Sequence, residues 1–150
     1  LHHNMMEKAL ELAQQAADVD EVPVGAVVYD DAGTIWGTGS NLTITEADPS
    51  AHAEMVALRQ AAQKAGTPNL SGLCLATTLE PCAMCAGAMA WARIRAVHYG
   101  AVDVKSGGVL HGAKVFDHPT CHHKPDVIQG GFAEESKALL QAFFKAKRKN

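Results

Sequence analysis

The chain has 150 residues, of which 47% are hydrophobic, and 13 basic against 16 acidic residues give it a formal net charge of −3. This composition predicts one domain with a substantial core, and it argues against a nucleic-acid binder held by its overall charge. The sequence shows no apolar run long enough to cross a membrane, no secretory leader and no internal repeat, and its four cysteines do not suggest a disulfide framework. These features predict a soluble cytoplasmic protein.

The first part of the chain predicts a helix followed by a hairpin. Apolar residues recur at helical spacing over residues 5–19, which predicts the first helix, and residues 1–4 receive no role. Residues 24–29 and 34–39 are short strand-like runs, and the turn-rich link 30–33 between them predicts a hairpin.

The rest of the chain alternates helices with strands. A second helix is predicted over residues 51–65, closed by Gly66 and Pro68. The further predicted elements are a buried strand at 73–77, a helix at 83–92, a strand at 96–101, a long loop at 102–125, a short edge strand at 126–129 and a closing helix at 132–147. This alternation indicates a sheet covered by helices on both faces, but it does not fix the strand order.

Pro81 precedes two thiols, Cys82 and Cys85, at the start of the third predicted helix. Because proline is favoured in the first helical turn, both thiols should share one helix face there. The free N–H groups and the dipole at that end favour thiolates, which bind a soft cation such as zinc. Taken alone, the Cys-x-x-Cys spacing is equally compatible with a redox dithiol or with two small buried residues.

A second proline-led helix start lies upstream, where Pro49 precedes His52 and Glu54. Catalytic zinc sites use three protein ligands and keep a fourth position for water, and His52 completes that count with Cys82 and Cys85. Glu54 is too close in sequence to His52 to be a second ligand from the same helix, but it could reach the water. It is therefore predicted to be the proton shuttle.

The segment His52-Ala53-Glu54 followed by Pro81-Cys82-Ala83-Met84-Cys85 resembles the signature of zinc-dependent nucleoside and nucleobase deaminases. From about residue 5 to the end, the chain more narrowly resembles the bacterial tRNA wobble-adenosine deaminases. The segments that carry this resemblance are Glu21-Val22-Pro23-Val24-Gly25-Ala26-Val27, Asn41, Ala51-His52-Ala53-Glu54, Thr78-Leu79-Glu80-Pro81-Cys82, Met84-Cys85-Ala86-Gly87-Ala88 and Phe143-Phe144.

The resemblance implies a fold and a reaction. The fold would be one zinc-dependent deaminase domain over residues 1–150, with a cytidine-deaminase-like three-layer α/β/α architecture, a five-stranded mixed sheet, and both ligand helices on one face. One zinc ion per chain, held by His52, Cys82 and Cys85, would activate water toward the amino-bearing ring carbon of adenine. Glu54 would move the water proton to the ring nitrogen and assist the departure of ammonia, which leaves inosine. The implied substrate is the wobble adenosine in the anticodon loop of an arginine tRNA, and the implied assembly is a homodimer.

The same resemblance assigns residues to the substrate. The residues expected in the pocket or near the neighbouring nucleotide are Val24, Asn41, Ala53, Met84, Asp103 and Lys105. Asn41 is expected to hydrogen-bond the flipped base, although an asparagine at a strand end is also a common turn residue. Core packing would explain Val24 and Met84 equally well.

The C-terminal end concentrates positive charge that the net value hides. The residues assigned there to the RNA backbone are Phe144, Lys145, Lys147, Arg148 and Lys149. A charged chain end is more often solvated and frayed, but the resemblance favours contact with tRNA phosphates.

Two alternatives to a tRNA deaminase stay open at this point. The first is a deaminase of a free nucleobase, guanine or cytosine, which would use the same zinc chemistry. The second is a binding module with a structural zinc ion held by Cys82, Cys85, His118 and His122. The spacer of 32 residues between Cys85 and His118 is longer than the roughly 12–15 residues usual for such fingers, and this site would leave His52 and Glu54 unused. His122 and His123 could instead contact phosphate or cap the loop; the sequence does not decide between these roles and assigns none to Cys121.

Overall fold

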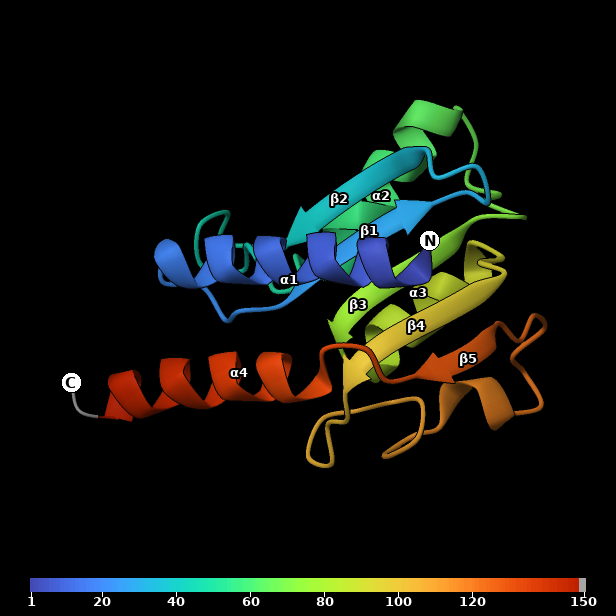
Figure 1. Ribbon diagram of the computed structural model, residues 1–150. Coiled ribbons are helices and arrows are strands. Elements are labelled where there is room, and N and C mark those ends of the chain that lie inside the picture. The colour runs from blue at the N-terminus through green and yellow to red at the C-terminus, as the bar shows by residue number, and fades with distance from the viewer. Residues whose placement is uncertain (149–150) are drawn as a thin grey trace.

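The computed structural model describes residues 1–148 (Figure 1). In chain order the elements are α1 (His2–Asp18), β1 (Gly25–Tyr29), β2 (Ile35–Ser40), α2 (Ala53–Ala65), β3 (Cys74–Leu79), α3 (Ala83–Trp91), β4 (Ala96–Ala101), the 3₁₀ turn η1 (Val115–Asp117), β5 (Asp126–Gln129) and α4 (Ala133–Arg148). None of the helices in this described part has the length and apolar character that crossing a bilayer requires.

The strands form one five-stranded mixed sheet in the order β2-β1-β3-β4-β5. Strand β1 pairs antiparallel with β2 and with β3, whereas β3–β4 and β4–β5 are parallel pairs. The short turn between β1 and β2 allows a hairpin, while each parallel pair needs a longer crossover, which α3 and the loop before β5 supply. The predicted hairpin, the mixed sheet and the edge position of β5 are confirmed.

Helices cover both faces of the sheet. Figure 1 shows α1 on one face and α2 with α3 on the other. Neighbouring residues of β1 point to opposite sides, so that Val27 belongs to the core beneath α1 and Val28 to the core beneath α2 and α3. Because both faces are covered, all five residues of β1 are buried. The predicted three-layer architecture, with both ligand helices on one face, is confirmed.

The first helix begins earlier than the sequence predicts. Helix α1 starts at His2, not at residue 5, so most of the segment that received no role is helical. The ring of His2 stacks on that of His98 at a centroid distance of 4.1 Å, and its Nδ1 lies 2.5 Å from the hydroxyl of Tyr29. Contacts with the sheet therefore extend the helix beyond its apolar periodicity.

The prolines of the two motifs lie outside the helices, which corrects the expectation of proline in the first turn. Helix α2 begins at Ala53 with His52 as its N-cap, and α3 begins at Ala83 with Cys82 as its N-cap; both caps have extended backbone conformations. Pro81 instead precedes its cap, where its carbonyl accepts the N–H of Gly108 at 2.7 Å. The two ligands therefore sit at the junction between an extended segment and a helix.

Two glycines of β2 allow α2 to lie directly on the strand. A Cβ atom on Gly39 would fall 2.1 Å from the carbonyl oxygen of Ala53, and one on Gly37 would fall 2.2 Å from that of Ala57. No side chain fits at these points, so the helix backbone rests on the strand backbone. This close packing fixes the start of α2, and with it His52.

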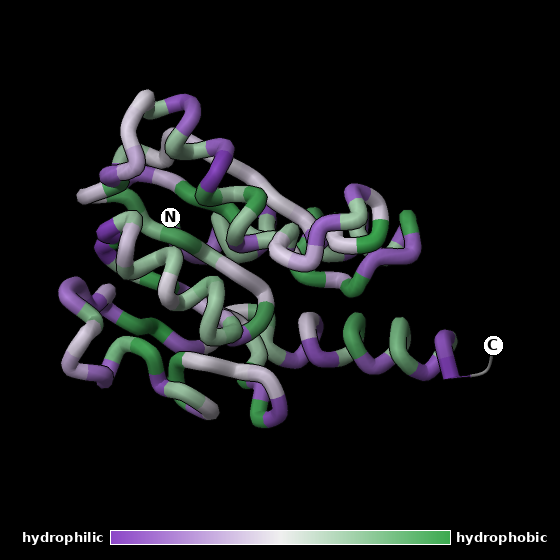
Figure 2. The backbone as a smooth tube through the Cα atoms, turned by 180° about the vertical axis from the view of Figure 1, so that it is seen from behind, coloured by the Kyte–Doolittle hydropathy of each residue, from purple (hydrophilic) through white to green (hydrophobic). Residues whose placement is uncertain are grey.

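Helix α4 differs from the other helices because most of its length extends beyond the sheet and is not buried. Its one buried residue is Ser136, and the helix projects past the sheet beside α1 with alternating apolar and polar residues (Figures 1 and 2). Near its end the Lys147 ammonium group pairs with Asp20, which follows α1, at 2.5 Å. Lys149 lies outside the described residues.

Candidate active site

The starts of α2 and α3 bring one imidazole and two thiols together. His52 Nδ1 lies 3.5 Å from Cys82 Sγ and 3.6 Å from Cys85 Sγ, and the three ligand atoms all lie within 4.8 Å of one another. Among the described residues, these three side chains are the group of at least three His, Cys, Asp or Glu residues that could hold a metal ion. His118 and His122 do not belong to this group. The alternative prediction, a structural zinc ion held by Cys82, Cys85, His118 and His122, is therefore wrong.

The spacing of these donors fits zinc. In a tetrahedral site with Zn–S bonds of about 2.3 Å and Zn–N bonds of about 2.0–2.1 Å, a thiolate and an imidazole lie about 3.6 Å apart. The two S···N distances in this protein match that value. Since each ligand is at or next to a helix start, the free N–H groups there also favour the thiolate form.

A hydrogen bond between the two thiols shifts their pKa values in opposite directions. A hydrogen bond from Cys85 lowers the pKa of Cys82 to about 5, and His52 acts in the same direction against the effect of burial. The same hydrogen bond and burial raise the pKa of Cys85 above its usual range. One thiolate is thus preformed, and a bound cation would take the place of the proton on the other.

Glu54 lies in the first turn of α2 and is only 4% exposed. Burial raises the pKa of Glu54 to about 8. Because burial disfavours the charged form, this carboxyl group takes up a proton more readily than an exposed one, as a group that accepts a proton and returns it requires. Its position beside His52 and Cys82 in the same cavity gives it access to a molecule held at the three ligands.

A cavity of about 230 Å³ opens above this cluster. The sequence-predicted residues that line it are Val24, Asn41, His52, Ala53, Glu54, Cys82 and Asp103. Its volume is below the roughly 300–1,000 Å³ of pockets that bury a drug-sized ligand, so it suits one nucleobase and leaves the remainder of a larger substrate outside.

A larger groove of about 790 Å³ continues from this cavity, and Val22, Leu79, Asp103 and Ser106 line both. The predicted RNA contacts that line the groove are Asp103, Lys105, Phe144, Lys147 and Arg148. Lys145 is exposed on α4 but is not among the lining residues. The structure therefore joins residues from the loop after β4 and from α4 in one groove that leads to the metal ligands.

Met84 does not lie where the sequence places it. Its side chain is 40% exposed on α3 and does not line the cavity above the metal ligands. The reason is the helix start: Cys85 points inward from α3, so the neighbouring Met84 points outward.

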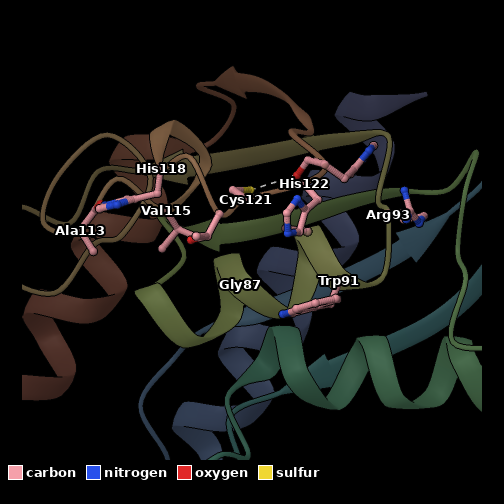
Figure 3. Close-up of a pocket in the computed structure, with 11 residues that line it drawn as sticks. Gly87, Trp91, Arg93, Ala113, Val115, His118, Cys121 and His122 are labelled. Carbon is pink, nitrogen blue, oxygen red and sulfur yellow. Dashed lines mark hydrogen bonds between the residues drawn. The ribbon is translucent and has the colours of Figure 1, made fainter.

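The histidine-rich loop borders a separate cavity of about 600 Å³ beside the far end of α3 (Figure 3). Trp91, Arg93 and His122 contribute to its walls, and Trp91 is 81% exposed. His123 Nε2 lies 2.7 Å from the Ile94 carbonyl oxygen, which fastens the loop to the start of β4. A loop-holding role, left open by the sequence, thus falls to His123.

Several lining residues carried no signal in the sequence. Thr43 and Ser106 are short polar residues in loops, and only the fold brings them to the cavity. Glu80 also lines the cavity, but its carboxylate accepts backbone N–H groups of Asp103 and of residues 109–111. Although burial raises its pKa, the hydrogen bond with His111 and those from the backbone together lower it.

Several known proteins are similar to this chain in sequence and in fold. The family described as the cytidine and deoxycytidylate deaminase zinc-binding region matches residues 1–101. A curated tRNA-specific adenosine deaminase of Agrobacterium fabrum (strain C58 / ATCC 33970) is 46% identical over 145 residues, which cover 97% of this chain and 95% of that protein.

Solved structures give the same result. One, from a study of A-to-I editing by tRNA:A34 deaminases at the wobble position of transfer RNA, superposes with a TM-score of 0.89 at 45% identity and covers 91% of this chain and 99% of that chain. The guanine deaminase of Nitrosomonas europaea superposes with a TM-score of 0.82 at 25% identity, over 94% of this chain and 83% of that chain. Since the family match spans more than half of the sequence and includes all three ligands, the chain belongs to the zinc-binding cytidine and deoxycytidylate deaminase family.

Proposed function

We propose that this protein is a zinc-dependent hydrolase that converts adenosine to inosine at the wobble position of tRNA, and that residues 1–150 act as one deaminase domain. The observation that carries the proposal is a base-sized cavity, floored by His52, Cys82 and Glu54 with Cys85 buried beside them, that opens into a long groove with basic and aromatic residues. A single free base would fill the cavity and leave the groove unused, whereas a nucleotide within an RNA chain would occupy both. The 46% identical relative named as a tRNA-specific adenosine deaminase supports the same substrate.

Each residue of the floor has a defined task in this proposal. His52, Cys82 and Cys85 would hold zinc, which would supply a Lewis acid that lowers the pKa of a water molecule so that it can act as a nucleophile at neutral pH. The Glu54 carboxylate would accept one proton of the attacking water and deliver it to the adenine ring nitrogen. It would then carry the remaining proton of the added hydroxyl to the amino group, which leaves as ammonia. Acid–base help of this kind contributes on the order of 10²–10⁴-fold to the rate.

The base is oriented by polar groups on the cavity wall. Asn41 is 6% exposed, and its side-chain amide donates to Thr43 Oγ1 at 3.4 Å, a long bond that leaves capacity for a base. The backbone N–H groups at the helix starts, at Ala53 and Cys82, orient base and water, and Val24 supplies an apolar contact.

The RNA outside the cavity follows the groove. Phe144 is 44% exposed, so its ring is available for stacking on a base next to the target. Asp103 and Lys105 lie nearby in the same groove, and Lys145, Lys147, Arg148 and Lys149 supply charge for phosphates. An anticodon loop presents unpaired bases, which reduces the cost of extruding the target. We include an arginine tRNA as the substrate on the family resemblance, and the cytoplasm as the location, where thiolate ligands stay reduced.

We further propose a homodimer in which α3 faces a second copy. Met84 and Trp91 lie on the outer surface of α3 and are 40% and 81% exposed, and an exposed tryptophan on an apolar helix face is typical of an interface. Sedimentation of the parent protein and of Trp91→Glu measures this directly. A monomeric parent protein contradicts the proposed assembly.

Ammonia release tests the substrate. The purified zinc protein is incubated with an anticodon stem-loop that carries the wobble adenosine and, separately, with guanine, cytosine and adenosine. We expect release from the stem-loop alone. The guanine deaminase of similar fold makes a free base the second candidate, and release from guanine or cytosine, with none from the stem-loop, would establish it.

A further inference from the structure

Two loops without helix or strand contribute walls to the cavity above the metal ligands. The loop between β2 and α2 supplies Asn41 and Thr43, and the loop after β4 supplies Asp103 and Ser106. Helix starts fix the floor, but a loop keeps one conformation only if its backbone groups are bound by other parts of the chain. Each wall therefore depends on the partners of its N–H groups.

The carboxylate of Glu80 holds the second loop with both oxygen atoms. Its Oε2 accepts the N–H groups of Val109, Leu110 and His111 at 3.3, 3.0 and 3.0 Å. Its Oε1 accepts the N–H of Asp103 at 3.0 Å and lies 2.9 Å from His111 Nδ1. Three successive N–H groups that converge on one anion form a backbone nest, and Glu80 fills it from inside the protein at 2% exposure.

The second loop packs on this carboxylate without room for a side chain. A Cβ atom on Gly107 would lie 2.3 Å from Glu80 Oε2, and one on Gly108 would lie 2.5 Å from the backbone nitrogen of Ala83. The loop is thus held between Glu80 and the start of α3, next to the ligand Cys82.

The first loop is bound by another buried carboxylate, that of Glu21, which is 1% exposed. Its Oε2 accepts the N–H of Thr45 at 2.6 Å, and its Oε1 accepts the N–H of Ile44 at 3.2 Å. Burial alone would raise the pKa of Glu21, but the hydrogen bonds from Thr45 and Ile44 outweigh it and lower the pKa. The carboxylate is therefore charged where it binds the loop.

We propose that Glu21 and Glu80 are positioning residues that hold the two loop walls of the substrate cavity. Glu21 acts through the loop that carries Asn41 and Thr43, and Glu80 through the loop that carries Asp103 and Ser106. A buried charge is retained only where hydrogen bonds compensate for its lost hydration. Here the compensating donors belong to the two loops, and the His111 side chain is one of them. The kinetic part of this inference rests on the proposed function; the structural part does not.

Amide hydrogen exchange of the zinc-loaded protein tests the structural part. Glutamine replaces each carboxylate with nearly the same volume but leaves one acceptor oxygen in place of two. Glu80→Gln should accelerate exchange at residues 109–111 by about tenfold or more and leave residues 44–45 unchanged, because removing a charge-assisted hydrogen bond opens only its own loop. Glu21→Gln should give the reverse pattern, so each variant is the control for the other.

Two results would overturn the proposal. One is unchanged exchange in the matched loop, and the other is equal acceleration in both loops and in the sheet, which would indicate general destabilisation. If Glu80→Gln does not yield folded, zinc-loaded protein, Gly107→Ala tests the attachment of the same loop, because the added methyl group would meet both the Glu80 carboxylate and the Asp103 carbonyl oxygen. It should open residues 109–111 and spare residues 44–45.

Kinetics on the stem-loop separate positioning from chemistry. Glu80→Gln and Glu21→Gln should raise KM by about tenfold and keep kcat within about threefold, since the walls bind the substrate and do not react. Glu80→Asp, which keeps the charge, should restore part of the loss. A fall in kcat of about a hundredfold at unchanged KM would overturn the positioning role. If the parent protein does not act on the stem-loop, the proposed function fails, and the exchange measurement still decides the role of the two carboxylates.

Discussion

The floor of the cavity and the end of α4 have opposite physical characters. On the floor, Cys85 and Glu54 are buried, and the helix starts that carry the ligands are packed against the sheet. On α4, only Ser136 is buried, and Lys147 contacts its own chain through Asp20. The residues of the proposed reaction centre therefore all come from one chain, whereas the basic helix obtains its proposed role only when a partner with negative charge is present.

The largest effect that sharpens this contrast is loss of the metal. Cys82→Ala, Cys85→Ala and His52→Ala each remove one donor of a three-residue site, so we expect all three variants to lose zinc and activity together. His118→Ala and His122→Ala are the matched controls and should keep both. Metal analysis of the five purified proteins measures the outcome, and zinc retained in His52→Ala would contradict the assigned ligand set.

Next in size is the proton shuttle. Glu54→Ala and Glu54→Gln should fold and hold zinc but lose at least about a hundredfold in kcat, as expected when a general acid–base is removed from an intact site. The rate of ammonia release at saturating stem-loop, with zinc content measured on the same sample, provides the check. Turnover close to that of the parent protein would remove Glu54 from the mechanism.

Substitutions on β2 and on α4 should differ in their effect on the stability of the protein. Gly39→Ala should lower the free energy of unfolding by about 1–3 kcal/mol, because the new Cβ has no space against the carbonyl of Ala53. Lys145→Ala, on the exposed side of α4, should change it by no more than about 0.5 kcal/mol. Urea unfolding of both zinc-loaded variants measures the difference. Equal stabilities would mean that α2 can move away from β2. The close packing of the two backbones would then not fix the position of His52.

The smallest effect concerns α4. Truncation after Phe144 should raise KM for the stem-loop and flatten the dependence of log affinity on log salt by roughly 0.7–0.9 for each phosphate that the shortened chain no longer binds. The value of kcat should hardly change, because these interactions are equal in the ground and transition states. Binding and initial rates at several salt concentrations test this. An unchanged KM and salt slope would leave α4 as a solvated end and favour a free base as substrate.

Individual basic residues refine that last prediction. Both Lys147 and Arg148 line the groove, but Lys147 is already paired with Asp20, whereas Arg148 is not among the ion pairs of the described residues. Exchanging one anionic partner for another gains less than making a new ion pair. Lys147→Gln should therefore change the salt slope less than Arg148→Gln, and binding of the stem-loop at several salt concentrations measures both slopes.

Much of the fold followed from local pattern. The predicted strands at 96–101 and 126–129 coincide with β4 and β5, because short strand-like runs there end at clear boundaries. The start of α1 was missed because the contacts of His2 lie with Tyr29 and His98, far away in the sequence. The positions of Pro49 and Pro81 were misjudged, since the sequence does not show which turn precedes a helix cap.

The active site divides in the same way. The motif spacing and the family resemblance together predicted His52, Cys82, Cys85 and Glu54, and the structure brings their side chains to one place. The spacing also argued against His118, because 32 residues separate it from Cys85, and the structure places His52 beside the two thiols. Acidic residues are common on surfaces, so nothing in the sequence marked Glu21 as a buried residue that binds a loop.

The unequal separation of the ligands along the chain affects how zinc couples to folding. Cys82 and Cys85 lie within one helical turn, but His52 is 30 residues away from Cys82. A newly made or unfolded chain can already hold the ion weakly through its two thiols, and only folding adds the imidazole. Metal that binds the unfolded chain contributes less to stability than its full affinity for the native state. Zinc should therefore stabilise this protein by the difference in binding free energy between a two-ligand and a three-ligand complex. That difference comes from one residue, His52, at the start of α2.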